Sequence, residues 1–489
     1  MNNITKTLQR FPKVFWVSNV IELFERWAWY GFYMAFALYL TGSKETGALG
    51  FSAAEKGAIM GTGSMLLYLL PILTGAIADR IGYRLVLIIS LSMYILGYWM
   101  VGTFNGFFEI YLSFIFLATA GALFKPIISA MISKTTDAET SSIGFGIFYM
   151  MINIGGFIGP FIVGALYQTN WNYVFYISMA TIAINYFFVF FMFEEPQRRE
   201  DEKSSIFSVV TQSVRNIITT LSNWKYVIFL IIMIAFWTAF NQLYYAFPVF
   251  VDDWVNTTNL YNSLHSIWPW LAEKIGTQQH TISAVTISSM DSLFIIIFQI
   301  IISGMVMRFK PLNAMMAGIL ILALGLSLMF SSTTGLIVVF GVLIFSIGEM
   351  ASSPKFTEYI GSIAPHDQKA LYMGTSFLPI AVAHSLAGWL SGDIYEHTAG
   401  KFYLLQQEIS KRGIHLSSDL SQSEYWKQAT QLTGMDKDLL SSLLWEQYTP
   451  SRIWMLYAGI AIAAVIALFA YDKLILRKKT NPTNKTAKA

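Results

Sequence analysis

The sequence contains no cysteine and little charge for its length. Without cysteine the chain has no disulfides, no zinc thiolate site and no thiol catalysis. Charged residues make up 12% and hydrophobic residues 55% of the 489 residues, and the mean hydropathy is +0.52. Ordinary soluble domains are about 25% charged, so the composition indicates a membrane protein. The sequence also lacks an H-E-x-x-H motif and a P-loop, and we expect neither an enzyme nor a bound metal or cofactor.

Long apolar stretches separated by short polar joints run through the whole chain. A membrane-spanning helix needs about 20 mostly apolar residues, and continuous apolar runs exclude the alternating pattern of a β-barrel. We therefore predict an all-α membrane protein with twelve spans. The first six are expected at about 14–40, 54–78, 84–103, 107–133, 142–167 and 173–193. The last six are expected at about 226–250, 284–308, 312–331, 334–355, 370–392 and 452–472.

The distribution of basic residues predicts the orientation. The net charge is +3, and the short loops on one side hold most of the basic residues, so both termini are expected in the cytoplasm. The charge gives no indication of a nucleic-acid partner. The polar stretch 1–13 leads into a run too long for a signal peptide, which we interpret as a retained first span. The basic residues of the inner loops are Arg80, Arg84, Lys134, Arg198, Arg199, Lys203, Arg308, Lys310, Lys369 and Arg477 to Lys479.

The domain organisation follows from the spans and the polar stretches between them. The expected parts are an N-terminal bundle 1–193, a cytoplasmic connector 194–224, a C-terminal bundle 225–476 and a basic tail 477–489. The connector turns amphipathic at 206–221, as expected of a helix lying on the membrane. The second half has two longer outer loops, 251–282 and 393–451, and the stretch 425–448 predicts short amphipathic helices. These loops either cap the outer mouth, bind a partner or are variable surface.

Charged residues inside the spans are the first indication of function. Glu22, Glu25 and Arg26 lie in the first span, and a charge at membrane depth costs about 2.5 to 3.5 kcal/mol on insertion scales. They must pair or contact water, either in a transport pathway or as a structural ion cluster. Lys125 and Glu349 are single charges in spans of opposite halves, and we expect them to pair across a central cavity. Protonation of Glu349 would then break the pair, whereas snorkelling of Lys125 is a weaker alternative.

The turn after the second span carries the pattern G-x-x-x-D-R-x-G-x-R. This pattern resembles the cytoplasmic signature of the major facilitator superfamily. Positive-inside flanking charge alone would explain the arginines but not the glycine and aspartate spacing. The resemblance implies a major facilitator fold of two six-helix bundles with a substrate site near the midplane between them. The residues of the pattern are Gly75, Asp79, Arg80, Gly82 and Arg84.

A more specific resemblance is to the proton-coupled oligopeptide transporter family, whose first helix reads E-x-x-E-R-F-x-Y-Y-G. Here residues 22–31 read E-L-F-E-R-W-A-W-Y-G. Further matching segments follow through the eleventh span, with Gly156 replacing a family serine. They contain Tyr68 before Pro71, Lys125 with Pro126, Phe148, Tyr149, Ile152, Asn153 and Gly155, Phe236, Trp237, Phe240 and Gln242, and Gly348, Glu349, Ser353 and Pro354.

The resemblance implies roles for individual residues. Arg26 and Lys125 would bind the substrate carboxylate, Lys125 and Glu349 would form the inner gate, and Asn153 would bind the substrate backbone. The candidates for the coupling proton are Glu22, Glu25, Asp291 and Glu349. The substrate-facing residues would be Arg26, Tyr30, Tyr33, Tyr68, Lys125, Asn153, Trp237, Asn241, Asp291 and Ser353.

The sequence departs from the family at four of these or neighbouring positions. Tyr33 and Asn241 replace the two charged residues of the usual outer salt bridge, and a hydrogen bond between them would replace that bridge. Asp291 stands where the family has an asparagine, and Ser376 where it commonly has tryptophan. Asp291 either receives a substrate amino group, takes up the proton, or acts in protonated form as an asparagine does.

These observations predict a proton-coupled symporter that imports di- and tripeptides by alternating access. A carrier for another small organic or peptide-like solute, with the four departures as specificity changes, is the nearer alternative. A non-transporting membrane sensor is the other, although buried charges argue against it. The expected partners are the peptide, the proton and the lipid bilayer, without nucleic acid. We expect a monomer in the bacterial plasma membrane.

Overall fold

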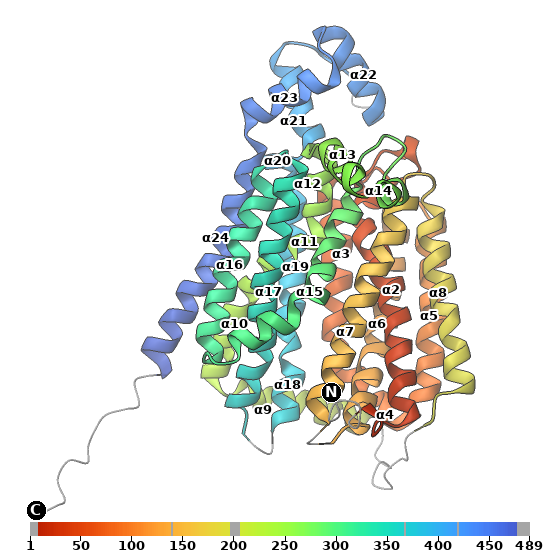
Figure 1. Cartoon of the computed structure of the whole chain (residues 1–489), viewed down its shortest axis with the longest axis vertical. Helices are drawn as coiled ribbons and strands as arrows, with labels where there is room; N and C mark the ends of the chain where they lie inside the picture. Colours follow the sequence, from red (N-terminus) through yellow and green to blue (C-terminus); the bar gives the residue numbers. More distant parts are fainter. Residues whose placement is uncertain (1–7, 138–139, 196–205, 366–367, 418–419, 477–489) are drawn as a thin grey trace, which may run out of the picture.

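The computed structural model describes residues 8–137, 140–195, 206–365, 368–417 and 420–476. Apart from two isolated β-bridges, these residues form helices and connecting turns. The helices make two groups, one from each half of the chain, that stand side by side (Figure 1). The prediction of an all-α membrane protein is therefore confirmed.

Helices of the first half lie close to the predicted spans. The helix α3 is followed directly by α4, which begins at Pro71 and is bent by 47° from it. The helices are α2 (Lys13–Thr41), α3 (Ala53–Leu69), α4 (Pro71–Ile81), α5 (Tyr83–Thr103), α6 (Phe107–Lys134), α7 (Ser141–Leu166) and α8 (Asn172–Phe191).

Helices of the second half include two broken spans. The seventh predicted span is divided into α10 (Trp224–Phe240), α11 (Gln242–Tyr245) and α12 (Phe247–Trp254), and the eleventh into α18 (Lys369–Thr375), α19 (Phe377–Trp389) and the π-helix η2 (Leu390–Ile394). The others are α15 (Ala284–Val306), α16 (Pro311–Ser331), α17 (Gly335–Ile363) and α24 (Ile453–Ala470).

Nine described helices are long and apolar enough to cross a membrane, or ten if α3 and α4 are one span. Many of their side chains remain exposed on the outside of the bundle, such as Ile300 (87%) and Phe191 (75%), as expected of a surface that faces lipid. Neither α2, which carries the charges of the first span, nor the divided eleventh span is among the ten. The integral membrane class is confirmed, whereas the count of twelve rests on the predicted spans.

The two ends of the bundle carry different extra elements (Figure 1). We call one the connector end, because the amphipathic connector helix α9 (Ile206–Leu221) lies there. We call the other the cap end. It carries α13 (Thr258–Ile267), α14 (Pro269–Ile275), α20 (Tyr395–Ala399), α21 (Lys401–Lys411), α22 (Gln422–Thr433) and α23 (Lys437–Tyr448). The helices α22 and α23 confirm the prediction made for 425–448, whereas 196–205 and the basic tail lie outside the described residues.

Backbones from the two halves meet toward the cap end. A Cβ atom added at Gly57 of α3 would lie 2.2 Å from the Gly388 carbonyl oxygen of α19, and one added at Gly388 would lie 2.4 Å from that of Gly57. Only glycine permits this approach. A Cβ at Gly164 of α7 would likewise lie 2.3 Å from the Thr286 hydroxyl of α15. Small residues therefore bring the two bundles into direct contact on this side.

Candidate functional site

Three charged residues of α2 form a buried group that we call the first-helix cluster. Arg26 Nε lies 3.1 Å from Glu22 Oε1, one helical turn away, and also contacts Glu25 Oε2. The other Glu25 oxygen accepts a hydrogen bond from the Tyr94 hydroxyl of α5. Glu22 Oε2 and Arg26 Nη2 have no hydrogen-bond partner among the described residues. The cluster therefore keeps one acceptor and one donor for a proton or a substrate group.

Lys125 of α6 lies beside the first-helix cluster. Its ammonium group sits 3.8 Å from the centroid of the Tyr68 ring, which is a close cation–π contact. It also interacts electrostatically with Arg26 and with both acids of the cluster. The N-terminal bundle thus places two cations and two carboxylates in one buried region.

Asp291 of α15 and Glu349 of α17 form a second buried group, the carboxyl pair. Their side chains lie close enough to interact with each other, and a direct hydrogen bond between two carboxyl groups needs a proton on one of them. The Ser346 hydroxyl, one turn before Glu349, donates to Asp291 Oδ1 at 2.6 Å. Because two adjacent negative charges repel strongly in a buried site, such a pair holds one proton between its members.

A cavity of about 170 Å³ receives side chains from both halves of the chain, including Glu349 of the carboxyl pair. Predicted site residues that line it are Tyr30, Tyr33, Tyr68, Trp237, Asn241 and Glu349. Its other walls are mostly aromatic or apolar and were not among the predicted site residues: Trp29, Ser64, Leu67, Phe240, Tyr244, Ile380 and His384. A small solute in this cavity would meet Glu349 directly. It would also meet the rings of Tyr30 and Tyr68, over which the Arg26 and Lys125 cations lie.

Two predicted contacts do not form in this structure. Tyr33 does not bond Asn241; its hydroxyl is 2.8 Å from Ser64 Oγ, because a turn of α3 lies closer to it. The Asn241 Nδ2 atom has no partner in the described part of the chain. Lys125 and Glu349 also form no ion pair here, since Lys125 contacts Tyr68 and Glu349 contacts Asp291.

Other predicted site residues are buried or partly buried but are not among those that line the cavity: Arg26, Lys125, Asn153, Asp291 and Ser353. Asn153 of α7 is buried, and its side-chain amide donates to the Tyr149 carbonyl oxygen at 2.9 Å. Trp237 lines the cavity, and its indole N–H, like the Ser353 hydroxyl, has no partner among the residues described. Ser376 is buried and donates to the Met373 carbonyl oxygen at 2.6 Å. No group of three potential metal-ligating side chains occurs in the described ranges.

The G-x-x-x-D-R-x-G-x-R turn lies at the connector end and ties helices of the N-terminal bundle together. Gly82 joins α4 to α5 at a φ of +112°, which favours glycine. Arg84 donates from Nε and Nη2 to backbone carbonyls at the end of α8. Glu195 accepts the backbone N–H groups of Tyr83 and Arg84 at 2.7 and 2.8 Å, and so caps α5. Asp79 contacts the Tyr83 hydroxyl.

Lys56 is a buried cation that the sequence analysis missed. It lies in the first turn of α3, and its Nζ donates to the Tyr245 carbonyl oxygen at 3.1 Å and to that of Ser391 at 2.8 Å. The side chain is fully buried and faces the Tyr395 ring at 5.6 Å. Nothing local distinguishes it from an ordinary lysine at a helix start. It links α3 to both broken spans of the C-terminal bundle, at the end where the glycines meet.

We expect Lys56→Met to loosen the contact between the bundles at the cap end. The substitution removes two hydrogen bonds from a charged donor, each of which contributes about 1.5 to 3 kcal/mol. Because the chain has no cysteine, Ser64→Cys provides a single label site in the cavity wall. An impermeant maleimide added from the cap side should label the double variant at least about tenfold faster than Ser64→Cys alone.

The control for that measurement is Lys44→Met, which removes an exposed lysine at the same end of the molecule. This variant should leave the labelling rate of Cys at position 64 unchanged. Equal labelling rates for Ser64→Cys alone and for the double variant with Lys56→Met would show that Lys56 does not hold the bundles together.

The sequence is similar to those of known membrane transporters. Residues 20–255 match the sequence model of the Major Facilitator Superfamily. A di-/tripeptide transporter of Lactococcus lactis subsp. cremoris is 26% identical over 281 residues, which is 53% of this chain and 52% of the relative. The uncharacterized transporter YclF of Bacillus subtilis (strain 168) is 30% identical over 165 residues, 33% of each chain. The chain thus spans a third to a half of these relatives' length.

Solved structures resemble the chain over nearly its whole length. A POT family transporter in complex with 5-aminolevulinic acid superposes with a TM-score of 0.67 at 17% identity, covering 95% of this chain and 99% of that one. A mutant of the peptide transporter POT in complex with alafosfalin has the same score and identity, with 94% of each chain covered. The major facilitator fold is therefore confirmed.

Proposed function

Because the chain is similar in sequence and in fold to the proton-coupled oligopeptide transporters of the Major Facilitator Superfamily, we propose that it is a proton-coupled symporter of di- and tripeptides. The observation that carries the proposal is the cavity between the bundles, which is lined by Glu349 of the carboxyl pair and by Tyr30 and Tyr68, the two rings over which Arg26 and Lys125 lie. A short peptide is a zwitterion, and these cations and acids have the charges opposite to those of its two ends.

The roles of the residues follow from their positions. Arg26 Nη2 and the Lys125 ammonium group bind the substrate carboxylate. Tyr30, Tyr68 and Asn153 contact the peptide backbone. The carboxyl pair binds the amino end. An ammonium ion can replace the shared proton there because it supplies both a positive charge and hydrogen-bond donors. Trp237, Asn241 and Ser353 contribute donors that have no partner among the residues the structure describes.

Proton coupling is assigned to the acids of the carboxyl pair and of the first-helix cluster. The carboxyl pair holds one transferable proton, and Glu22 Oε2 offers a second acceptor in the first-helix cluster. The two bundles contact each other at the cap end through Lys56, Gly57 and Gly388. We assign the cap end to the outer face. In the alternate conformation, Lys125 and deprotonated Glu349 would pair and close the inner end.

The proposed protein is integral to the bacterial plasma membrane, with the connector end and both termini in the cytoplasm. The basic inner loops support this orientation. It works as a monomer without a cofactor, and the proton is its only coupling ion. The domains are the bundles 1–193 and 225–476 joined by the connector 194–224.

Uptake of a labelled dipeptide into proteoliposomes tests the substrate. One inward proton at a membrane potential of 100 mV contributes about 2.3 kcal/mol, enough for about 50-fold accumulation, and each unit of pH gradient adds about tenfold. We expect unlabelled di- and tripeptides, but not free amino acids, to compete. Competition only by another small solute would favour a related carrier, and no solute uptake at all would favour a sensor.

A further inference from the structure

His384 of α19 lines the cavity but has no part in the mechanism described above. Its imidazole is held on two sides. The ring stacks on Tyr68 with a centroid distance of 4.9 Å and an interplanar angle of 19°, and Nδ1 is 3.1 Å from the hydroxyl of Tyr245 in α11. The ring is therefore fixed in orientation by one face and one edge.

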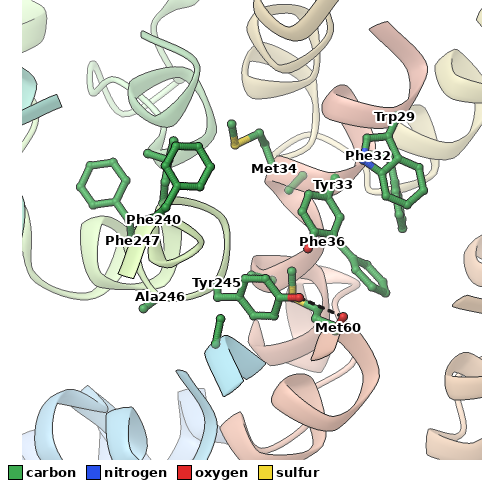
Figure 2. Close-up of a cluster of buried hydrophobic side chains, with 14 of the residues drawn as sticks. Trp29, Phe32, Tyr33, Met34, Phe36, Met60, Phe240, Tyr245, Ala246 and Phe247 are labelled. Atoms are coloured by element: carbon green, nitrogen blue, oxygen red, sulfur yellow. Dashed lines mark hydrogen bonds between the residues drawn. The ribbon is translucent and has the colours of Figure 1, made fainter. Parts of the chain in front are cut away.

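The hydrogen bonds of Tyr245 determine which ring nitrogen carries the proton. The Tyr245 hydroxyl donates to the Met60 carbonyl oxygen at 3.0 Å (Figure 2). A hydroxyl has one proton, and a carbonyl can only accept. Tyr245 therefore accepts from His384, whose Nδ1 is the donor. In a neutral imidazole the other nitrogen, Nε2, is then an acceptor.

The second nitrogen is left for the cavity. His384 Nε2 makes no hydrogen bond within the described ranges, although the side chain lines the cavity. A second proton on the ring would add a positive charge close to the Lys125 ammonium group, which lies over the same Tyr68 ring, and the like charges would repel. The rest of the cavity wall is largely aromatic, so a neutral acceptor held in one place favours a solute that carries a hydrogen-bond donor.

We propose that His384 Nε2 accepts a hydrogen bond from the transported solute and gives the cavity a preference for substituents with a hydroxyl or amide donor over apolar substituents of the same shape. This inference rests on the proposed peptide transport. The site would be specific because an apolar isostere leaves the buried acceptor unpaired. Tyr245 is the positioning residue, since its hydroxyl fixes the tautomer.

Two pairs of isosteric dipeptides test the proposal by competition against a labelled dipeptide. Each varied residue is placed next to alanine in both orders. The first pair compares serine with 2-aminobutyrate, which replaces the hydroxyl by a methyl group. The second compares O-methylserine, an acceptor without a donor, with norvaline. We expect serine to be favoured by about 2- to 12-fold in at least one order, and O-methylserine not to be favoured at all.

Variants identify the residue responsible. His384→Phe keeps the stacking on Tyr68 but removes the acceptor, so the serine preference should disappear. Tyr245→Phe should weaken it, because the tautomer is no longer fixed. Ile380→Val changes the same cavity wall one turn away on α19 and should retain the preference.

Several outcomes would overturn the proposal. One is transport of these peptides by the wild-type protein without a serine preference. Another is a preference for O-methylserine over norvaline, since the ring would then be a donor. A serine preference that survives in His384→Phe would assign it to another group. Failure to transport any peptide would instead contradict the proposed function, and the inference would fall with it.

Discussion

Replacing Glu349 by glutamine is expected to abolish pH-driven accumulation while solute exchange across the membrane continues. In the proposed mechanism the carboxyl pair holds one proton between Asp291 and Glu349, which interact closely, and an amide cannot take up and release it. With a potential of 100 mV, the accumulation ratio should fall from about 50 to about 1. Asp291→Asn should have the same effect, because the proton is shared. Counterflow of labelled dipeptide into vesicles preloaded with unlabelled dipeptide measures exchange separately.

The matched control is Glu358→Gln on the same helix. Glu358 forms an ion pair of 2.7 Å with Lys355, but its side chain is 53% exposed, and such pairs contribute little. Accumulation should be unchanged in this variant. Undiminished pH-driven accumulation in Glu349→Gln or Asp291→Asn would exclude the carboxyl pair as the proton site, leaving Glu22 or Glu25. Loss of exchange together with accumulation would make the pair a binding site only.

The second large effect is expected for Arg26→Lys, which should reduce peptide uptake by at least about 100-fold. Arg26 Nε meets both acids of its cluster, while Nη2 has no partner among the described residues and is the donor proposed for the substrate. Lysine has a single nitrogen and cannot serve the two acids and the substrate with the fixed geometry of a guanidinium group. When a buried charge loses its partner, the protein is typically destabilised by about 3 to 5 kcal/mol. In Arg26→Lys the charge at risk is that of Glu22 or Glu25. Initial rates across substrate concentrations would show whether KM, the maximal rate or both change.

Arg412→Lys provides a control with the same spacing. Arg412 Nε lies 2.7 Å from Glu408 Oε1 four residues earlier, but at the C-terminal end of α21 in the cap rather than in a membrane span. Its replacement should change uptake less than about threefold. A similar loss of uptake in Arg26→Lys and Arg412→Lys would mean that either replacement of arginine by lysine impairs the protein. Arg26 would then have no particular role in transport.

Most of the fold was predictable because the bilayer constrains it. Runs of about 20 apolar residues in a membrane can only be helices, so the positions of α5, α6 and α16 were predicted within a residue or two. The breaks in the seventh and eleventh spans were not predicted. Apolar composition continues through Asn241 and Ser376, and composition alone does not reveal where a helix changes direction.

The candidate site was predicted in composition but not in all its contacts. Charges within spans identified the first-helix cluster, Lys125 and Glu349, since ionisable residues at membrane depth are costly and usually belong to a functional site. The partner of each charge depends on how neighbouring helices are rotated. Asp291 meets Glu349 because α15 and α17 are adjacent, and no feature of either segment alone indicates this.

Two residues were missed or undervalued for different physical reasons. Lys56 is in the first turn of its helix, where lysine usually reaches the surface, and its burial depends on broken helices from the other half. In the sequence His384 is a lone histidine within an apolar span, which fits packing between helices or lining of a pore. Its hydrogen-bonding state depends on Tyr245, which is 139 residues away in the chain.

The central claim is that peptide and proton cross together through the cavity between the bundles. The most direct measurement uses proteoliposomes that contain a pH-sensitive dye, with no imposed pH gradient and with the membrane potential clamped at zero. Addition of a dipeptide outside should acidify the lumen, at a rate that follows peptide entry, and Glu349→Gln should remove this acidification. Peptide entry without any change of lumen pH in the wild-type protein would contradict the account.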